Sequence, residues 1–563
     1  MRKILRVLVS RYTLSAIFIL AELFILSYFI FYAYAYSLIF VLVSAAVDVL
    51  VIVSLINRDT NPEFKLTWLA VVTLIPLVGG ALYIIFSQRK MTKKEAKLLK
   101  DIFSGIKENE NQSRDSEYSS KNLASLAEIS SVAPGRAVSI LKDDYICVLY
   151  SNTKCTYYPS GEEFFASLIT KLGSAKRYIF LEYFIVEEGE MWQKIYQILS
   201  RKVKEGVEVR MLYDDIGSMS TVPAKFASEL REEGIMCFRF GKVIPKVTAS
   251  HNNRDHRKIA VIDGECAFTG GINIADEYIN KKEKYGHWKD GSVMVEGDAA
   301  RGFARLFLML YDFTVGKVSD YSRFLPILQD KDGHRIERNG TEENSAEINT
   351  EEQENKETNT KKQTKMEEDI GEPNGKDGAF LGYVIPFGSG PAPTYKEPVG
   401  KNVLMNLIGI AKRYIYITTP YLIIDYDLTE ALRGASKRGV DVRIITPHIA
   451  DKKIIKIMTK SAYPYLLEAG VRIFEYTPGF IHEKLVVSDD TYAVVGTINL
   501  DYRSLVHHFE DGLWMYGGEE ILKMHKSFLD TETASHEILR EDAKLNPIER
   551  IVRNLVRIIA PLL

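Results

Sequence analysis

Two short segments of the chain repeat one spacing of histidine, lysine and aspartate. NNRDHRKIAVIDG and FIHEKLVVSDD both fit the pattern His-any-Lys-four any-Asp, with His256, Lys258 and Asp263 in the first and His482, Lys484 and Asp489 in the second. Histidine can attack phosphorus or transfer a proton, and lysine supplies positive charge to an oxyanion. The motifs are therefore either two separate sites or two halves of one site, and their six residues are the candidate catalytic set.

The alternation of side chains along a strand separates the members of each motif. HRKIAVID and HEKLVVSD are both typical of buried strands, in which alternate residues share a face. In each motif the histidine and the lysine then share a face, whereas Asp263 and Asp489 have the opposite parity. We expect these aspartates to fix the turn after each strand rather than to transfer protons.

A Gly-x-x-Asn element follows each aspartate at the same spacing, as GGIN at residues 270–273 and GTIN at residues 496–499. Small residues let an anion approach backbone N–H groups, and asparagine and threonine side chains add neutral donors. The predicted phosphate-binding residues are Gly271, Asn273, Thr497 and Asn499. One such motif alone would be interpreted as structural, but two matched copies favour a site for a phosphoryl group.

Composition and charge argue against several other kinds of site. No metal is expected, because the lysine beside each histidine repels a cation and no carboxylate cluster accompanies it. The four cysteines, Cys147, Cys155, Cys237 and Cys266, form no close pair, so reduced thiols are expected rather than zinc ligands or a disulfide framework. The net charge of −2 gives no electrostatic reason to expect nucleic-acid binding.

The chain also contains an internal repeat around the two motifs. AKRYIFLEYF matches AKRYIYITTPY, KEGVEVRMLYD matches KRGVDVRIITP, and EEGIMCFRF matches EAGVRIFEY, in the same order and at an offset of about 230 residues. Within each copy, short β-rich runs alternate with amphipathic helical stretches, which is typical of an α/β sandwich. The sequence predicts two tandem α/β halves, at residues 136–325 and 379–563, related by a pseudo-twofold axis.

Two further segments are predicted to lie outside the two α/β halves, one as a connection before the first half and one as an insert between the halves. Residues 91–135 are expected to be a helix and linker before the first half. Residues 326–378 are highly polar with few large apolar side chains, so we expect a disordered insert that is a tolerated surface loop rather than a regulatory segment.

Residues 1–90 are predicted to be a transmembrane α-helical anchor. The apolar segments lie at about 13–34, 37–56 and 64–86, and a bilayer-crossing helix needs roughly 20 apolar residues. Pro76, Gly79 and Gly80 interrupt the third segment, so two or three spans and a re-entrant hairpin remain open. The basic residues from Arg89 to Lys100 favour a multi-pass protein of the cell membrane with a cytoplasmic catalytic domain.

With these motifs the sequence resembles the phospholipase D superfamily and, within it, the bacterial cardiolipin synthases. The similar segments are NPEFKLTWLAVVTLIPLVGGALYIIF, LEYFIVEEG, GVEVRMLYDDIGS, NRDHRKIAVIDGECAFTGGINIADEY, HWKDGSVMVEG, YIYITTPYLIID and TINLDYRSL. The chain departs from the family at Thr497, where serine is common, in its long polar insert, and in its first apolar segment.

The resemblance implies metal-independent phosphatidyl transfer, without a cofactor, between two phosphatidylglycerol molecules. It makes His256 the nucleophile that forms a phosphatidyl-histidine and His482 the general acid and base. It also implies that Asp290 and Glu510 orient the histidines, with weaker candidates at Glu182 and Tyr183. The expected partners are phosphatidylglycerol and membrane lipids, and homo-oligomer formation remains open.

Three alternative functions remain at this point. A phospholipase D-type hydrolase or headgroup transferase would use the same motifs with another acceptor. A non-catalytic lipid-binding protein is disfavoured by the intact histidines and lysines. A nuclease is disfavoured by the apolar N-terminal region and the near-neutral charge.

Overall fold

The computed structural model describes residues 38–325 and 382–543 apart from short gaps, together with scattered residues between 20 and 32 and between 547 and 554. The gaps are residues 59–60, 76–77, 87–90, 114, 132, 134, 136–146 and 244–251. The predicted polar insert at 326–378 and most of the apolar segment at about 13–34 lie outside the described residues.

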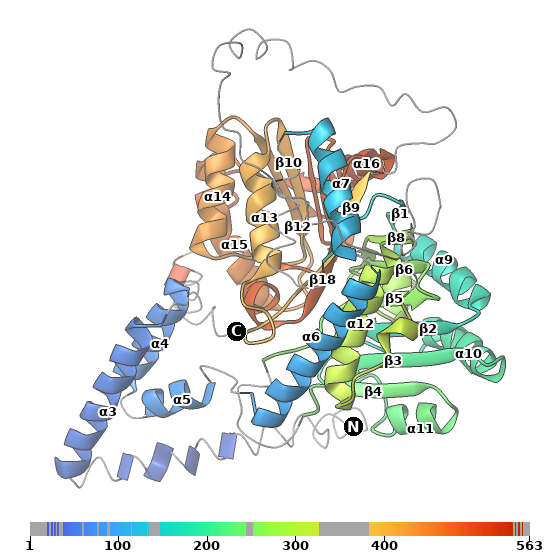
Figure 1. Ribbon diagram of the computed structural model, residues 1–563. Helices are drawn as coiled ribbons and strands as arrows, with labels where there is room; N and C mark the ends of the chain where they lie inside the picture. The colour runs from blue at the N-terminus through green and yellow to red at the C-terminus, as the bar shows by residue number, and fades with distance from the viewer. Residues whose placement is uncertain are drawn as a thin grey trace, which may run out of the picture.

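The first half is built on a seven-stranded mixed sheet with the strand order β1-β8-β6-β5-β2-β3-β4 (Figure 1). Its strands are β1 (Thr153–Tyr158), β2 (Tyr178–Tyr183), β3 (Glu208–Asp214), β4 (Met236–Phe240), β5 (Lys258–Ile262), β6 (Cys266–Gly270) and β8 (Ser292–Gly297). Strands β2, β3 and β4 are parallel, and the remaining neighbours pair antiparallel. This arrangement agrees with the predicted alternation of strands and helices.

The second half repeats this sheet strand for strand. Its order is β19-β13-β12-β10-β15-β16-β18-β9, which matches the first half once the extra edge strand β19 is set aside. The strands are β9 (Tyr383–Ser389), β10 (Tyr414–Thr418), β12 (Asp441–Pro447), β13 (Arg472–Tyr476), β15 (Leu485–Ser488), β16 (Tyr492–Gly496), β18 (Glu510–Tyr516) and β19 (Ser535–Glu537). The prediction of two tandem α/β halves is therefore confirmed.

Helices cover both sheets (Figure 1). Those of the first half are α9 (Gly161–Ser174), α10 (Glu190–Lys204), α11 (Phe226–Glu232) and α12 (Ala300–Val315); those of the second are α13 (Val399–Ile410), α14 (Tyr426–Lys437), α15 (Lys453–Glu468) and α16 (Glu519–Thr533). Short turns of helix lie at Asp276–Ile279, Tyr321–Arg323 and Arg503–His507, the last of them π-helical. Two small parallel sheets pair β7 (His287–Lys289) with β14 (Gly479–Ile481) and β11 (Leu422–Ile423) with β17 (Leu500–Asp501).

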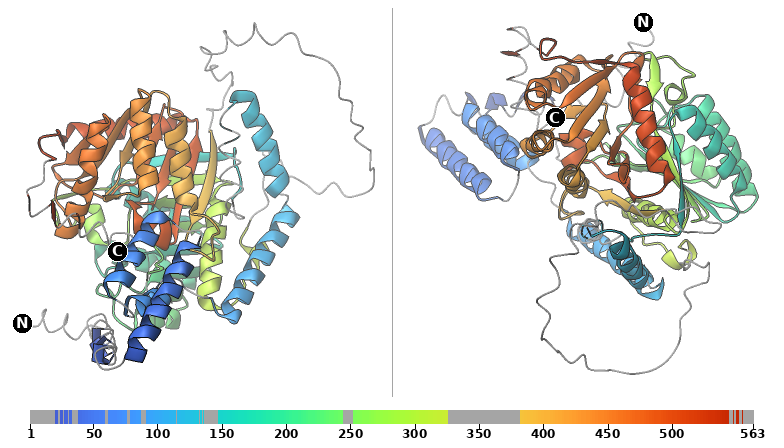
Figure 2. Two further views of the ribbon diagram at one scale, coloured as in Figure 1. Left: turned by 90° about the vertical axis from the view of Figure 1, so that its left-hand side faces the viewer. Right: turned by 90° about the horizontal axis from the view of Figure 1, so that it is seen from above.

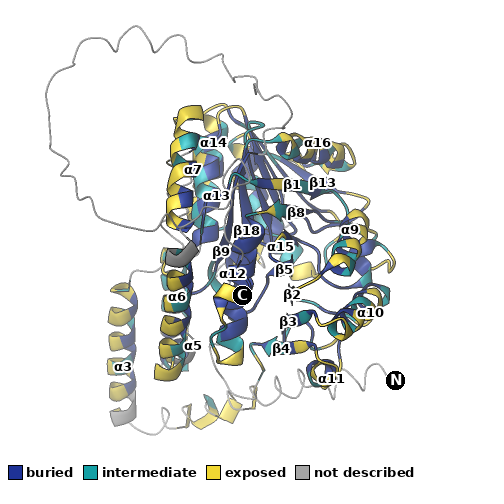
Figure 3. Ribbon diagram, turned by 45° about the vertical axis from the view of Figure 1, so that its right-hand side comes forward, coloured by how far each residue is buried: buried dark blue, intermediate teal, exposed yellow. Residues whose placement is uncertain are grey.

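Helices α12 and α16 join the halves reciprocally. Each follows the equivalent strand of its own half, β8 or β18, and packs against the edge strand of the other half. Gly302 of α12 lies against Pro386 of β9, and Glu520 of α16 accepts a hydrogen bond from Tyr157 N of β1 at 2.8 Å. Helix α12 is buried along nearly its whole length (Figure 3), so the two halves share one apolar core.

The motif aspartates brace the strands from behind the site, in the place that strand parity predicts. Asp263 has a left-handed φ of 56°, and its carboxylate accepts hydrogen bonds from the backbone N–H groups of Lys176, Arg177 and Tyr178 at 2.7–2.9 Å. Asp489, with φ 55°, accepts the equivalent three bonds from the backbone N–H groups of residues 412–414, at the start of β10. Asparagine and aspartate tolerate this backbone region better than other side chains.

The predicted helix and linker pack against the first half. They form α6 (Lys93–Ser113) and α7 (Asp115–Ile129). Arg301 on α12 donates to Asn109 Oδ1 at 2.9 Å, and Arg305 forms a short ion pair with Asp115. Both arginines are almost fully buried, so these contacts compensate charges that burial would otherwise make unfavourable.

The N-terminal apolar region forms a small helical unit beside the second half (Figure 2). It contains α3 (Leu38–Ile56), α4 (Pro62–Leu74) and α5 (Val78–Phe86), which share the cluster Val51, Leu55, Trp68, Val72 and Tyr83. The third apolar segment is thus two packed helices, as its proline and glycines allow. A Cβ at Gly79 would lie 2.4 Å from Val71 O, so glycine is required for α5 to approach α4.

Within the part of the chain that the structure describes, no helix combines the length and the apolar character needed to cross a membrane. The predicted transmembrane spans are therefore not confirmed. Residues 37–56 correspond to α3, and residues 64–86 correspond to most of α4 and to α5.

Replacing Asp263 with alanine should destabilise the fold. The substitution leaves three backbone donors without their acceptor and puts alanine at positive φ, which together should lower the free energy of unfolding by roughly 2–4 kcal/mol. Urea unfolding followed by tryptophan fluorescence measures this change. Asp530→Ala, at an exposed position, should change it by less than about 0.5 kcal/mol. Loss of turnover in Asp263→Ala with unchanged stability would instead give this aspartate a direct chemical role.

Candidate active site

Backbone hydrogen bonds between the halves bring the two motifs together. Asp255, just before the first motif histidine, forms a parallel bridge with Phe509, and His256 N donates to Phe509 O at 2.9 Å. In the symmetric place, β14 pairs with β7, and His482 N donates to Lys289 O at 2.7 Å. The residue before each histidine is thus paired with the residue before a carboxylate of the other half. The two motifs form one site.

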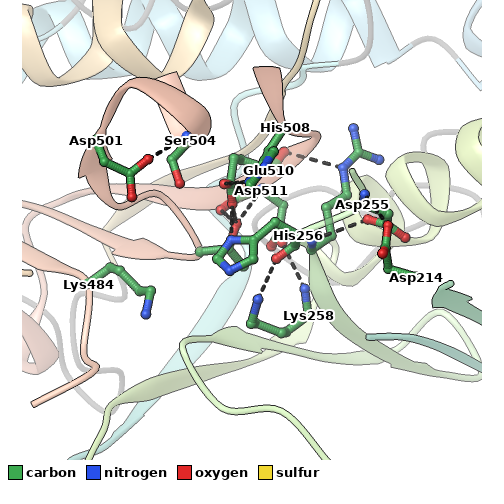
Figure 4. Close-up of polar contacts among 12 residues, drawn as sticks. Asp214, Asp255, His256, Lys258, Lys484, Asp501, Ser504, His508, Glu510 and Asp511 are labelled. Atoms are coloured by element: carbon green, nitrogen blue, oxygen red, sulfur yellow. Dashed lines mark hydrogen bonds and ion pairs between the residues drawn. The ribbon is translucent and has the colours of Figure 1, made fainter. Parts of the chain in front are cut away.

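Each histidine is hydrogen-bonded to a carboxylate of the other half. His256 Nδ1 lies 2.9 Å from Glu510 Oε2 (Figure 4), and His482 Nδ1 lies 2.8 Å from Asp290 Oδ2. The sequence indicated both carboxylates but not this crossing. Because a carboxylate accepts a proton from Nδ1–H, each ring presents its Nε2 lone pair for chemistry.

Further contacts hold the two carboxylates in place. Thr497 Oγ1 donates to Glu510 Oε2 at 2.5 Å. A Cβ at position 271 would lie 2.0 Å from Asp290 Oδ1, so Gly271 leaves the room that this carboxylate occupies. Two of the predicted phosphate contacts, Gly271 and Thr497, therefore contact the histidine-orienting acids in the structure.

The two predicted asparagines differ in their contacts. Asn273 Oδ1 accepts from Ile185 N at 3.0 Å, and its Nδ2 donates to Tyr278 Oη at 2.6 Å. Asn499 is also buried, but its Oδ1 has no hydrogen-bond partner. Only the second asparagine therefore keeps an unused polar atom at its carbonyl end.

The motif lysines lie beside their histidines on the same strand faces. Lys258 Nζ donates to His256 O at 2.6 Å, and Lys484 Nζ lies 2.9 Å from His482 Nδ1 and forms a short contact with His482 O. Both lysine side chains are almost completely buried. Two buried cations at one point favour binding of an anion.

Burial controls the charge of this site. Burial, with the nearby cations, lowers the pKa of His256 well below its ordinary value and that of His482 to about 4, so both rings are neutral at neutral pH. Burial also lowers the pKa of Lys258 to about 8 and that of Lys484 to about 7. The pKa values of both lysines therefore lie near neutral pH, so a small rise in pH removes their positive charge.

The two orienting carboxyl groups differ in ionisation. Burial raises the pKa of Glu510 to about 7. Burial also acts to raise the pKa of Asp290, but His482 and Lys484 outweigh it, and the pKa falls below its ordinary value. Asp290 is thus ionised at neutral pH, whereas Glu510 is close to its midpoint.

Aromatic side chains wall the site. Phe184 packs edge-on against His256 with ring centroids 5.1 Å apart. Tyr278 and Trp288 each lie 5.5 Å from the His482 ring. These rings exclude water from the histidines and so strengthen the electrostatic interactions there.

Residues that the sequence analysis did not select also lie here. His508 has its ring 5.6 Å from that of His256, and Asp511 accepts from Lys258 N at 3.3 Å. The run HHFED, which places two histidines before the selected glutamate, was the available signal for both. The two weaker candidate site residues lie in different surroundings. Glu182 is fully buried beside Asp255, and Tyr183 belongs to the core of the first half.

One group of side chains has the composition of a metal site. Potential ligand atoms of His256, His508 and Glu510 lie within 4.8 Å of one another. A metal there would compete for the imidazole nitrogens and would be repelled by the ammonium groups of Lys258 and Lys484. The residues therefore fit an anion better than a cation.

Comparisons with known proteins identify the family of the chain. A family model described as "Cardiolipin synthase, PLD-like domain" matches residues 168–291 and 404–531, and one described as "Phospholipase_D-nuclease N-terminal" matches residues 46–88. A cardiolipin synthase of Geobacillus sp. (strain WCH70) is 30% identical over 91% of this chain and 91% of its own length. One from Alkalihalophilus pseudofirmus is 31% identical over 90% of each chain.

Two further comparisons identify another similar sequence and a solved structure with a similar fold. An uncharacterized protein of Streptococcus mutans is 36% identical over 90% of this chain and 98% of its own length. The crystal structure of phosphatidylserine synthase from Haemophilus influenzae superposes with a TM-score of 0.50 and 16% identity, covering 73% of this chain and 95% of that one. At this identity the similarity extends to the fold alone.

The crossed pairing predicts which histidine responds to each carboxylate. Glu510→Gln should shift the imidazole NMR signals of His256 and leave those of His482, and Asp290→Asn should do the reverse, because each acid contacts the ring of the other half. Each change should also lower kcat by roughly 10- to 1000-fold, since the ring loses its orienting charge. Asp530→Asn serves as the matched control. Signals that move within one half instead would contradict the crossed arrangement.

Proposed function

This chain belongs to the phospholipase D-like cardiolipin synthases, and from that membership we propose that it converts two phosphatidylglycerol molecules into cardiolipin and glycerol. The observation that supports this reaction most directly is the pair of histidines, each held by a carboxylate of the other half. With Lys258 and Lys484 beside them, the two rings provide a nucleophile, a proton donor and positive charge for one phosphodiester.

The first step transfers a phosphatidyl group to the protein. The anionic phosphodiester favours protonation of a neighbouring imidazole, so binding produces one neutral and one protonated histidine. The neutral Nε2 forms a bond to phosphorus while the bond from phosphorus to the headgroup oxygen breaks. The imidazolium gives its proton to that oxygen, and glycerol leaves.

The second step transfers the phosphatidyl group to the acceptor. The histidine that gave up its proton now removes one from a hydroxyl group of a second phosphatidylglycerol. The freed oxygen attacks phosphorus, the N–P bond breaks, and cardiolipin is released with both histidines restored. Atoms and charges balance over the two steps without any redox change, metal or cofactor.

The ionisation of the two carboxyl groups supports an order for the histidines. Asp290 is ionised at neutral pH and stabilises a protonated His482, which suits the general acid and base. Glu510 is only partly ionised, so it stabilises an imidazolium at His256 less. His256 is therefore proposed as the nucleophile.

We also propose that the N-terminal region holds the enzyme at the membrane. Leu38, Leu50 and Leu74 on the unit α3–α5 are 69–80% exposed apolar side chains, which favours contact with lipid. The unit is docked on the second half through Asn61, whose Nδ2 donates to Asp425 Oδ2 at 3.0 Å. The basic residues from Arg89 to Lys100 support a cytoplasmic location of the catalytic halves in this proposal.

Purified protein given radiolabelled phosphatidylglycerol in the presence of a chelator should form cardiolipin and glycerol. His256→Asn and His482→Asn should each lower cardiolipin formation by roughly 10³-fold or more, because either change removes one of two groups that act together. Thin-layer chromatography of the lipid products measures both. The matched control is His536→Asn at an exposed position on β19, which should retain full activity.

Three results would contradict parts of this function. Phosphatidic acid as the sole product would identify a hydrolase. Dependence on an added divalent cation would favour the group His256, His508 and Glu510 as a metal site. Substantial synthesis by either motif variant would contradict the single shared site.

The reaction should lose efficiency on the alkaline side. A lysine carries its positive charge below its pKa, so kcat/KM for phosphatidylglycerol should fall as pH rises through the pKa values of about 7 for Lys484 and about 8 for Lys258. Initial rates at subsaturating lipid measure this profile. Lys484→Arg, whose guanidinium stays charged, should move the start of the fall toward the pKa of Lys258. An unchanged kcat/KM up to about pH 9 would contradict the role of these charges.

A further inference from the structure

Residues 499–508, which run from just before β17 toward the start of β18, contain buried polar atoms without hydrogen-bond partners. They are Asn499 Oδ1, Ser504 Oγ and both ring nitrogens of His508. Buried polar groups in folded proteins nearly always have a partner, because an unsatisfied one costs free energy. Their concentration in one segment beside the active site indicates a ligand rather than a packing defect.

The His508 ring is placed to reach that ligand. Its centroid lies 5.6 Å from that of His256, and its Nδ1 is 3.8 Å from Glu510 Oε1, which is too long for a hydrogen bond. In Figure 4, His508 and Ser504 lie above the His256 ring, whereas Lys258 and Lys484 lie below it. In this view the two polar groups and the two lysines lie on opposite sides of the His256 ring.

The internal repeat shows that this polar flank is particular to one half. His508 lies two residues before Glu510, the place that Trp288 has before Asp290, and Ser504 lies five residues after Asn499, the place that Tyr278 has after Asn273. At His482 the equivalent positions thus carry aromatic rings that pack against the histidine. At His256 they carry polar groups without partners.

The protonation state of His508 limits what it can bind. Burial and the nearby charges of His256, Arg503, His507 and Arg254 lower its pKa well below its ordinary value, so the ring is neutral. A neutral imidazole has one N–H donor and one acceptor nitrogen. The hydrogen bond from His508 N to Arg503 O at 2.8 Å fixes the backbone and leaves both ring nitrogens unused.

We infer that His508, assisted by Ser504, is a further phosphate-binding residue that donates its N–H to a non-bridging oxygen of the phosphodiester. When Nε2 of His256 attacks in line, the non-bridging oxygens lie to the side of the attacking nitrogen, where the lysines and His508 are found. The lysines neutralise charge from one side, and His508 adds a neutral donor from the other. The inference rests on the proposed function only in placing the phosphorus between His256 and His482.

The test uses inorganic phosphate as a competitive inhibitor of bis(p-nitrophenyl) phosphate hydrolysis by the full chain. His508→Phe should weaken phosphate inhibition by roughly 10- to 100-fold, the effect expected for a hydrogen bond to a charged group. His508→Gln, which keeps a side-chain N–H donor, should recover most of the affinity. The control His536→Phe, at an exposed strand position, should leave the inhibition constant unchanged.

The thermal midpoint distinguishes a binding role from a structural one. His508→Phe removes two unsatisfied buried atoms at similar volume, so the midpoint should stay the same or rise by about 1–3 °C. Ser504→Ala, a smaller change, should weaken phosphate inhibition severalfold without lowering the midpoint, and it keeps the test valid if the phenylalanine variant does not fold. Unchanged inhibition in both variants, or a loss that follows a lowered midpoint, would overturn the inference.

The same assay separates this inference from the proposed function. Inorganic phosphate and bis(p-nitrophenyl) phosphate contain no glycerol, so the result does not depend on which phospholipid is the substrate. Normal phosphate inhibition in His508→Phe together with defective use of phosphatidylglycerol would overturn the phosphate role and assign the residue to the headgroup. Failure of the unaltered enzyme to make cardiolipin would count against the proposed function alone.

Discussion

Backbone pairing between the two halves is the constraint on which the active site depends. His256 N donates to Phe509 O and His482 N donates to Lys289 O, and each bond places a histidine opposite a carboxylate of the other half. Neither half alone contains an oriented histidine. The reciprocal packing of α12 on β9 and α16 on β1 holds the halves in the register that this pairing needs.

Burial of the site also determines the ionisation of its side chains. Two lysines and two acids are withdrawn from water at one point, and neutral histidines result. Burial lowers the pKa values of both lysines and outweighs the nearby carboxylates, which act to raise them. An anion bound beside the two lysines would favour their charged form.

Much of this arrangement can be predicted from the sequence, and the parts that cannot be predicted have identifiable physical reasons. The repeat predicts two equivalent sheets, and strand parity predicts that Asp263 and Asp489 point away from the histidines, as their backbone contacts show. The crossing of the acids is not predictable, because Asp290 and Glu510 each follow a motif of their own half. Only the tertiary bridge between Asp255 and Phe509 and the β7–β14 pair decide it. The predicted transmembrane spans are not confirmed among the described residues. The third apolar segment is divided between α4 and α5, in the region where its sequence contains Pro76 and Gly79.

The two sides of the site are related by pseudo-symmetry but are not identical. The backbone of each half supplies a histidine, a lysine and an orienting acid in equivalent places, which would make the two histidines interchangeable. Differences at equivalent positions of the repeat remove that equivalence. Gly271 in the first half corresponds to Thr497 in the second, and Trp288 corresponds to His508. Thr497 bonds to Glu510, whereas the glycine only makes room for Asp290, so the two acids differ in their surroundings. Their pKa values differ because burial dominates at Glu510, whereas His482 and Lys484 outweigh burial at Asp290. The duplicated fold thus supplies the geometry of the site, and the few positions at which the copies differ give the two histidines different surroundings.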